Sequence, residues 1–215
     1  EASWEEALDM AAGRLARVRD EHGPSAMAGF GSAKGTNEEA YLVQKLVRTG
    51  FGTNNVDHCT RLCHASSVAA LLENIGSGAV TASFAECRNA EAIIVIGANP
   101  TVNHPVAATF IKNAAQRGAR LYILDPRGQH LDRYATESIR FSPGSDVAML
   151  NAMINVIITE ELYDADYVAK QTEGFEDLKA RTAHTTPEAM APICGVDADT
   201  LRRVARGYAT AGSAM

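Results

Sequence analysis

The chain has 215 residues, of which 46% are hydrophobic and 21% charged, so it can build an ordinary globular core. Its formal net charge of -6, without a dense cluster of Lys and Arg, argues against a nucleic-acid binder, which must neutralise phosphates. No apolar run reaches the roughly 18 residues of a membrane span, and the acidic, amphipathic start is unlike a signal segment. We therefore expect a cytoplasmic protein with no membrane span, whose cysteines are reduced.

The first third of the sequence predicts a helix and then a strand, loop and helix unit. Apolar residues recur every three or four positions over 2–20, and Ser3 followed by Glu6 is typical of an N-terminal capping box. The elements expected next are a short strand, a glycine loop, a helix and another short strand, over 25–30, 31–35, 37–51 and 53–57.

The middle of the sequence has the pattern of a parallel sheet. A helix is expected over 65–75, and the apolar, β-branched run at 92–96 lacks alternation, as in strands that are covered on both faces. A helix over 105–116, with Pro in its first turn, separates that run from a second buried strand at 121–124. Strand, helix and strand in this order predict a parallel, right-handed unit, to which 138–141 adds a further strand.

From there to the end the pattern is helical, with helices predicted over 147–160, 164–170, 175–182, 187–193 and 198–209. The expected fold class is therefore α/β: a doubly wound, mostly parallel, Rossmann-like sheet with a C-terminal helical extension. The predicted parts are an N-terminal helix leading into the core, an α/β core and a mostly helical extension, over 1–24, 25–145 and 146–215. Because a helical pattern is already under way at the first residues, we expect a piece of a longer protein.

Ligands of parallel sheets bind beyond the carboxyl ends of the strands, so five loops are candidates for one binding edge. These loops are 31–35, 57–64, 97–104, 125–128 and 143–146. The loop Gly97-Ala-Asn99-Pro100 leaves a buried strand shortly before a helix, so its backbone amides can face an anion. A purely structural turn explains the same residues equally well.

The other loops carry polar residues with two interpretations each. Asp125 can accept hydrogen bonds from ribose hydroxyls or cap its own turn, and Arg127 can neutralise a phosphate. Asp146 can accept hydrogen bonds from guanine, or it can form the start of a helix together with Ser145. Lys34 can reach a phosphate or be solvated, which is the commoner fate of a single Lys.

The heptad 58–64, His-Cys-Thr-Arg-Leu-Cys-His, has several interpretations. A zinc site would take four ligands from seven residues, whereas structural zinc usually binds two separated pairs. Those ligands would be His58, Cys59, Cys63 and His64. The Cys-x-x-x-Cys spacing differs from thioredoxin-like motifs, and two buried, inert cysteines are a third interpretation. A thiolate at Cys63, just before the helix at 65–75, would be stabilised by the helix N-terminus as a nucleophile or soft metal ligand.

The segment 53–68, TNNVDHCTRLCHASSV, resembles the active-site segment of molybdenum- or tungsten-dependent formate dehydrogenases of the molybdopterin oxidoreductase superfamily. In that family the residue matching Cys63, a cysteine or selenocysteine, ligates the metal, and the residue matching His64 assists substrate handling or proton transfer. Cys59 matches a position without a ligand role. Related periplasmic nitrate reductases have Cys-Met in place of Cys63-His64, so the resemblance favours formate over nitrate.

The resemblance extends along essentially the whole chain and implies a site for molybdopterin guanine dinucleotide. Asn99 and Arg127 would face the phosphates and sugars, and Asp125 and Asp146 the guanosine end. The residues expected at the cofactor are Lys34, Gly97, Asn99, Pro100, Asp125, Arg127, Gly144 and Asp146. The family binds two such dinucleotides at one molybdenum or tungsten, and the longer chain also carries an iron–sulfur cluster.

The implied reaction is the reversible two-electron oxidation of formate to CO2, in which His64 can accept a proton or donate a hydrogen bond. The cysteines of the iron–sulfur cluster, an arginine that binds formate and the domains around the second pterin lie outside this sequence, so we expect this chain alone to be inactive. The expected partners are the remaining domains of the subunit and electron-transfer subunits with iron–sulfur or flavin centres.

Two other functions are compatible with the sequence. One is a different molybdopterin oxidoreductase, such as a nitrate reductase, or a homologue that has decayed into a structural subunit, although Cys63 and His64 argue against decay. The other is a non-catalytic α/β interaction module with a zinc-stabilised loop.

Overall fold

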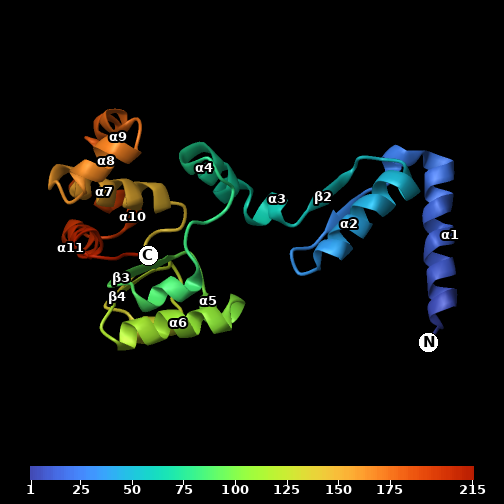
Figure 1. Ribbon diagram of the computed structural model, residues 1–215, viewed down its shortest axis with the longest axis horizontal. Coiled ribbons are helices and arrows are strands. Elements are labelled where there is room, and N and C mark those ends of the chain that lie inside the picture. Colours follow the sequence, from blue (N-terminus) through green and yellow to red (C-terminus); the bar gives the residue numbers. More distant parts are fainter. The chain divides into compact units, whose positions relative to one another are not determined.

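The computed structural model describes residues 1–215, which form two compact units, Glu1–Thr81 and Ala82–Met215 (Figure 1). The elements of the first unit are α1 (Trp4–His22), η1 (Pro24–Ala26), β1 (Gly29–Gly31), α2 (Asn37–Lys45), η2 (Leu46–Phe51), β2 (Val56–His58), α3 (Thr60–Cys63) and α4 (Ala65–Ile75). Those of the second unit are η3 (Phe84–Arg88), β3 (Ala92–Ile96), α5 (Pro100–Asn103), α6 (Pro105–Gln116), β4 (Arg120–Leu124), η4 (His130–Tyr134), β5 (Glu137–Ile139), α7 (Asp146–Thr159), α8 (Ala165–Gln171), α9 (Phe175–Thr182), α10 (Pro187–Cys194) and α11 (Ala198–Ala209). None of these helices is both long and apolar enough to cross a membrane.

The first helix, α1, begins at the predicted capping box. The Ser3 hydroxyl accepts a hydrogen bond from the Glu6 amide at 3.2 Å, and the Ser3 amide donates to the Glu6 carboxylate at 2.8 Å. The apolar stripe of the helix is nevertheless uncovered, since no residue of α1 is buried and Trp4 is 83% exposed. Its helicity therefore comes from local signals rather than from packing within this unit.

The first unit contains a two-stranded parallel sheet that is shorter than predicted. β1 covers only the end of the predicted segment 25–30, because Pro24 opens a tight turn of 3₁₀ helix that continues to Ala26. Its partner β2 pairs with it in register, from Gly29 opposite Val56 to Gly31 opposite His58. The loops that follow both strands therefore leave the same edge of this small sheet.

The second unit contains a three-stranded parallel sheet in the order β3-β4-β5. Side chains along β3 and β4 alternate between two hydrophobic clusters, with Ile93 and Ile123 in one and Ala92 and Leu124 in the other. Helix α6 covers the first face, and α7 and α11 cover the second (Figure 1). Both faces are covered by helices, which confirms the doubly wound α/β class.

The helices predicted as a C-terminal extension form the layer on the second face of this sheet. Met149 of α7 and Leu201 and Val204 of α11 are fully buried against β3 and β4. The approach of α11 is so close that a Cβ at Gly207 would overlap the Tyr122 hydroxyl. These helices and the sheet belong to one compact unit, while the predicted three-part division at residues 24 and 145 stays a prediction.

Candidate functional site

The heptad 58–64 connects strand β2 to helix α4 in the first unit. β2 ends at His58, α3 makes one turn and ends at Cys63, and His64 occupies the N-cap position of α4. The His64 carbonyl accepts a hydrogen bond from the Val68 amide at 2.7 Å, which fixes the start of α4. The side chains of Cys63 and His64 are exposed, and Cys63 Sγ lies 3.8 Å from His64 Nε2. An exposed thiol and an exposed imidazole therefore lie side by side at the start of α4.

Cys59 has different surroundings from Cys63. Its Sγ accepts a hydrogen bond from the Ala33 amide at 3.3 Å and lies 3.8 Å from His58 Nδ1. This contact ties the heptad to the loop after β1, which also carries the exposed Lys34. Cys59 is itself exposed, so the interpretation of two buried, inert cysteines is wrong.

An ion pair anchors the start of the heptad. Arg61 Nε donates to Asp57 Oδ2 at 2.7 Å, and the other oxygen of Asp57 accepts from the His58 amide at 2.8 Å. The hydrogen bond from Arg61, followed by that from the His58 amide, lowers the pKa of the Asp57 carboxyl. Both oxygens of Asp57 are therefore engaged in holding the loop.

The side chains of the heptad do not form a zinc site. Cys59 pairs with His58 and Cys63 with His64, and no group of three or more His, Cys, Asp or Glu side chains in residues 1–215 is arranged to hold a metal ion. A metal bound at Cys63 would need its other ligands from outside these side chains.

In the second unit, three candidate loops follow β3, β4 and β5 and so lie along one edge of the sheet. The loop after β3 leaves at Gly97, whose φ of 56° is a left-handed value that favours glycine. Asn99 is half-buried, and its Oδ1 accepts a hydrogen bond from the Thr101 hydroxyl at 2.6 Å. The helix that opens at Pro100 is only one turn long, so its dipole contributes less than the sequence predicts.

Asp125 follows β4 and is buried, with 6% of its surface exposed. Its Oδ1 accepts hydrogen bonds from the amides of Arg127 and Gly128 at 2.8 and 2.9 Å, so Asp125 does cap its own turn. Because both bonds use the same oxygen, Oδ2 is left for a ligand. The side chain of Arg127, next in the loop, is exposed.

The loop before α7 carries the last two candidates. Gly144 has a left-handed φ of 83°, and Ser145 occupies the N-cap position. The Ser145 hydroxyl donates to the Ser142 carbonyl at 2.6 Å rather than capping the helix. Asp146, the first residue of α7, is half-buried and is not the helix cap either, so its carboxylate can serve a ligand.

The five predicted loops therefore lie on two sheet edges rather than one. Loops 31–35 and 57–64 belong to the first unit, and loops 97–104, 125–128 and 143–146 to the second. The reason is that β1 and β2 pair only with each other and β3 only with β4 among the named strands. Hydrogen bonds join the loops after β1 and β2 in the first unit, through Ala33 and Cys59, and the loops after β3 and β4 in the second, through Ala98 and Gln129.

Gln129 is a residue of this edge that the sequence did not indicate. It lies one position beyond the predicted loop 125–128, is buried, and donates from Nε2 to the Ala98 carbonyl at 2.6 Å. The bond joins two loops that are far apart in the sequence, and no periodic pattern or motif marks it. Only a repeated Gln after the Asp-Pro-Arg segment in related sequences could have pointed to it.

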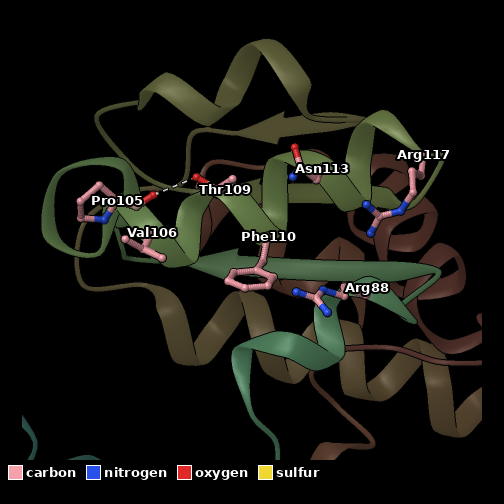
Figure 2. Close-up of a pocket in the computed structure, with 7 residues that line it drawn as sticks. All are labelled: Arg88, Pro105, Val106, Thr109, Phe110, Asn113 and Arg117. Atoms are coloured by element: carbon pink, nitrogen blue, oxygen red, sulfur yellow. Dashed lines mark hydrogen bonds between the residues drawn. The ribbon is translucent and has the colours of Figure 1, made fainter.

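A separate hollow lies between η3 and α6, away from the predicted residues (Figure 2). The Arg88 guanidinium lies 5.0 Å from the centre of the Phe110 ring, and Thr109 donates to the Pro105 carbonyl at 3.2 Å. None of the residues that line this hollow belongs to the predicted site.

A parallel sheet covered on both faces, with polar loops beyond the carboxyl ends of its strands, defines the class of open α/β folds that bind ligands at that edge. Within this class the chain belongs to the molybdopterin oxidoreductase family, because the sequence model of that family matches residues 1–203. That membership confirms the superfamily resemblance of the segment around Cys63 and His64, and it implies a molybdopterin cofactor with molybdenum or tungsten.

Named relatives show the range of the family. Formate dehydrogenase H of Escherichia coli is 43% identical over 213 residues, which cover 99% of this chain and 30% of the relative. A nitrate reductase of Symbiobacterium thermophilum is 36% identical over 222 residues, covering 99% of this chain and 29% of the relative. The solved acetylene hydratase of Pelobacter acetylenicus matches with a TM-score of 0.78 and 29% identity, over 100% of this chain and 29% of that one. This chain thus spans under a third of each.

Proposed function

We propose that this chain is part of the catalytic subunit of a formate dehydrogenase, which oxidises formate reversibly to CO2 at a molybdenum or tungsten bis(molybdopterin guanine dinucleotide) centre. The observation that carries the proposal is the exposed Cys63-His64 pair at the junction of α3 and α4, with its sulfur and ring nitrogen 3.8 Å apart. The relation to formate dehydrogenase H, at 43% identity, supports the choice of substrate.

Each part of the cofactor has a group of residues that suits it. The Cys63 thiolate would bind the metal, and the edge of the second unit would hold the guanine dinucleotide. The residues proposed there are Gly97, Asn99, Pro100, Asp125, Arg127, Gly144 and Asp146, and Lys34 of the first unit is proposed separately as a ligand of a cofactor phosphate. When bound, the metal centre supplies the acceptor for two electrons.

His64 is proposed to take the proton of the reaction. Formate loses two electrons and one proton to become CO2, so a base is needed within reach of the substrate. A neutral imidazole beside the metal ligand can accept that proton near neutral pH, and the exposure of His64 leaves its ring open to a substrate.

Nitrate reduction is the competing reaction, because a nitrate reductase is among the relatives. An acetylene hydratase shares the fold as well, so family membership does not by itself select a substrate. His64, directly after Cys63, favours formate because it places a proton acceptor beside the proposed metal ligand. Related periplasmic nitrate reductases have Cys-Met in place of Cys63-His64 and so lack this proton acceptor.

The rest of the subunit is proposed by analogy with its relatives, since this chain covers only 30% of formate dehydrogenase H. We propose that the remaining domains of the subunit supply an iron–sulfur cluster, the second pterin site and the formate-binding arginine, and that this chain alone is inactive. Electron-transfer subunits with iron–sulfur or flavin centres would receive the electrons, and the cytoplasm is the proposed location.

Metal and nucleotide analysis of the purified full-length protein tests this cofactor assignment. We expect about one molybdenum or tungsten and two guanine nucleotides per protein, because the family places two dinucleotides at one metal. Growth with molybdate and with tungstate, compared side by side, identifies the metal. Stoichiometric zinc, lost equally in Cys59→Ala and Cys63→Ala, would instead support the zinc-stabilised interaction module.

A further inference from the structure

Gln129 is anchored at both its backbone and its side chain. Its amide donates to Asp132 Oδ2 at 2.8 Å, while its side-chain Nε2 donates to the Ala98 carbonyl at 2.6 Å. Ala98 lies between Gly97 and Asn99 in the loop after β3. Gln129 therefore joins the loop after β3 directly to the loop after β4.

Arg140 makes further contacts with the segment after β4. Arg140 Nη2 donates to Asp132 Oδ2 at 2.6 Å, and its guanidinium lies 2.6 Å from the position where a Cβ of Gly128 would be. Gly128 also has a left-handed φ of 92°, so this contact needs glycine. The backbone position of Gln129 is consequently set by Asp132 and Arg140 and does not depend on its own side chain.

The orientation of the Gln129 amide is fixed, and it leaves one atom unsatisfied. Turning the amide over would place Oε1 against the Ala98 carbonyl, where two acceptors repel each other. In the observed orientation Oε1 is buried and receives no hydrogen bond. The Asp132 amide, which is near in sequence, donates instead to the backbone carbonyl of Gln129 at 3.1 Å.

A buried acceptor without a partner destabilises a fold, and an apolar side chain of similar length would avoid that cost. Glutamine at this position is therefore not explained by stability. The hydrogen bond that its side chain does make, from Nε2 to the Ala98 carbonyl, joins the loop of Asn99 to the loop of Asp125 and Arg127. Those loops carry the residues that we propose for the dinucleotide.

We infer that Gln129 is a positioning residue for the guanine dinucleotide: it holds the loops after β3 and β4 at the separation that the ligand requires, at the expense of stability. The inference rests on the proposed cofactor. Nε2 of Gln129 is used by the Ala98 carbonyl and the side chain is buried, so the proposed effect of Gln129 on the ligand acts through the two loops. Preorganised loops lose less freedom on binding, so the ligand binds more tightly.

The test uses Gln129→Met in the full-length protein, because methionine keeps the length of the side chain and removes both amide atoms. Gln116→Met, at the exposed end of α6, is the matched control. Two quantities are measured for each protein: the melting temperature of the cofactor-free form, and the affinity of that form for guanosine diphosphate by titration calorimetry.

We expect Gln129→Met to melt at the wild-type temperature or above it, while its affinity for guanosine diphosphate falls by about tenfold, the effect of roughly one hydrogen bond. The control should match wild type in both measurements. A lower melting temperature, or a variant that does not fold, would show that Gln129 is a structural residue and overturn the inference, and so would an unchanged affinity. A wild-type protein that binds neither guanosine diphosphate nor a guanine pterin would overturn the proposed cofactor and this inference together.

Discussion

Cys63→Ser in the full-length enzyme will remove nearly all formate oxidation. Serine has almost the same shape, but its hydroxyl is not ionised near neutral pH and is a hard oxygen donor, whereas the metal is expected to be bound by a soft thiolate. We expect formate-dependent dye reduction to fall by more than about 100-fold, since loss of even an outer-shell partner of a metal can cost that much. The metal content should fall while the protein remains folded, because Cys63 is exposed and packs against no core.

Cys59→Ser is the matched control for that experiment. Cys59 accepts a hydrogen bond from the Ala33 amide, and a serine hydroxyl can accept the same bond. We therefore expect Cys59→Ser to keep its metal and most of its activity. If both variants lost activity equally, or if Cys63→Ser kept it, the assignment of Cys63 as the metal ligand would be wrong.

His64→Ala is expected to have the second largest effect. Loss of a general base lowers turnover by about 100-fold to 10,000-fold, while the thiolate ligand and the cofactor stay in place. The expected result is therefore low formate turnover with wild-type metal and guanine content. Stopped-flow measurement of the first turnover separates this defect in the chemical step from slow release of product.

His58→Ala is the matched control on the other side of the heptad. The His58 ring lies 2.8 Å from the Thr60 hydroxyl and faces Cys59 rather than Cys63, so its loss should leave turnover within a few-fold of wild type. A His64→Ala enzyme with normal turnover would assign the proton to another group, and a variant without metal would make His64 a structural residue.

Several elements were predicted with the observed bounds, because their ends carry strong local signals. Helix α4 ends at Ile75, directly before Gly76, which takes the left-handed conformation that favours glycine, and α6 begins at Pro105. The strand β3 is a continuous apolar run, which identifies it without knowledge of its partners. The short strands were placed less well, since the three residues of β1 contain no periodic pattern.

The division into two units was not predictable in the same way. It depends on which strands pair, and the pairing of β1 with β2 alone follows from contacts between distant residues. The sequence left Asp125 with two interpretations, and the structure shows two capping hydrogen bonds at Oδ1 while Oδ2 has no bond within the protein. Gln129 was missed because its partner is a backbone carbonyl 31 positions earlier, which no side-chain pattern records.

The measurement that tests the central claim most directly is the substrate preference of the purified full-length enzyme under anaerobic conditions. Reduction of an oxidised dye with formate is compared with oxidation of the reduced dye by nitrate, in the same preparation and at matched concentrations. The proposed function predicts rapid dye reduction by formate, and none of it in Cys63→Ser. Turnover with nitrate and none with formate would contradict it and make this chain part of a nitrate reductase.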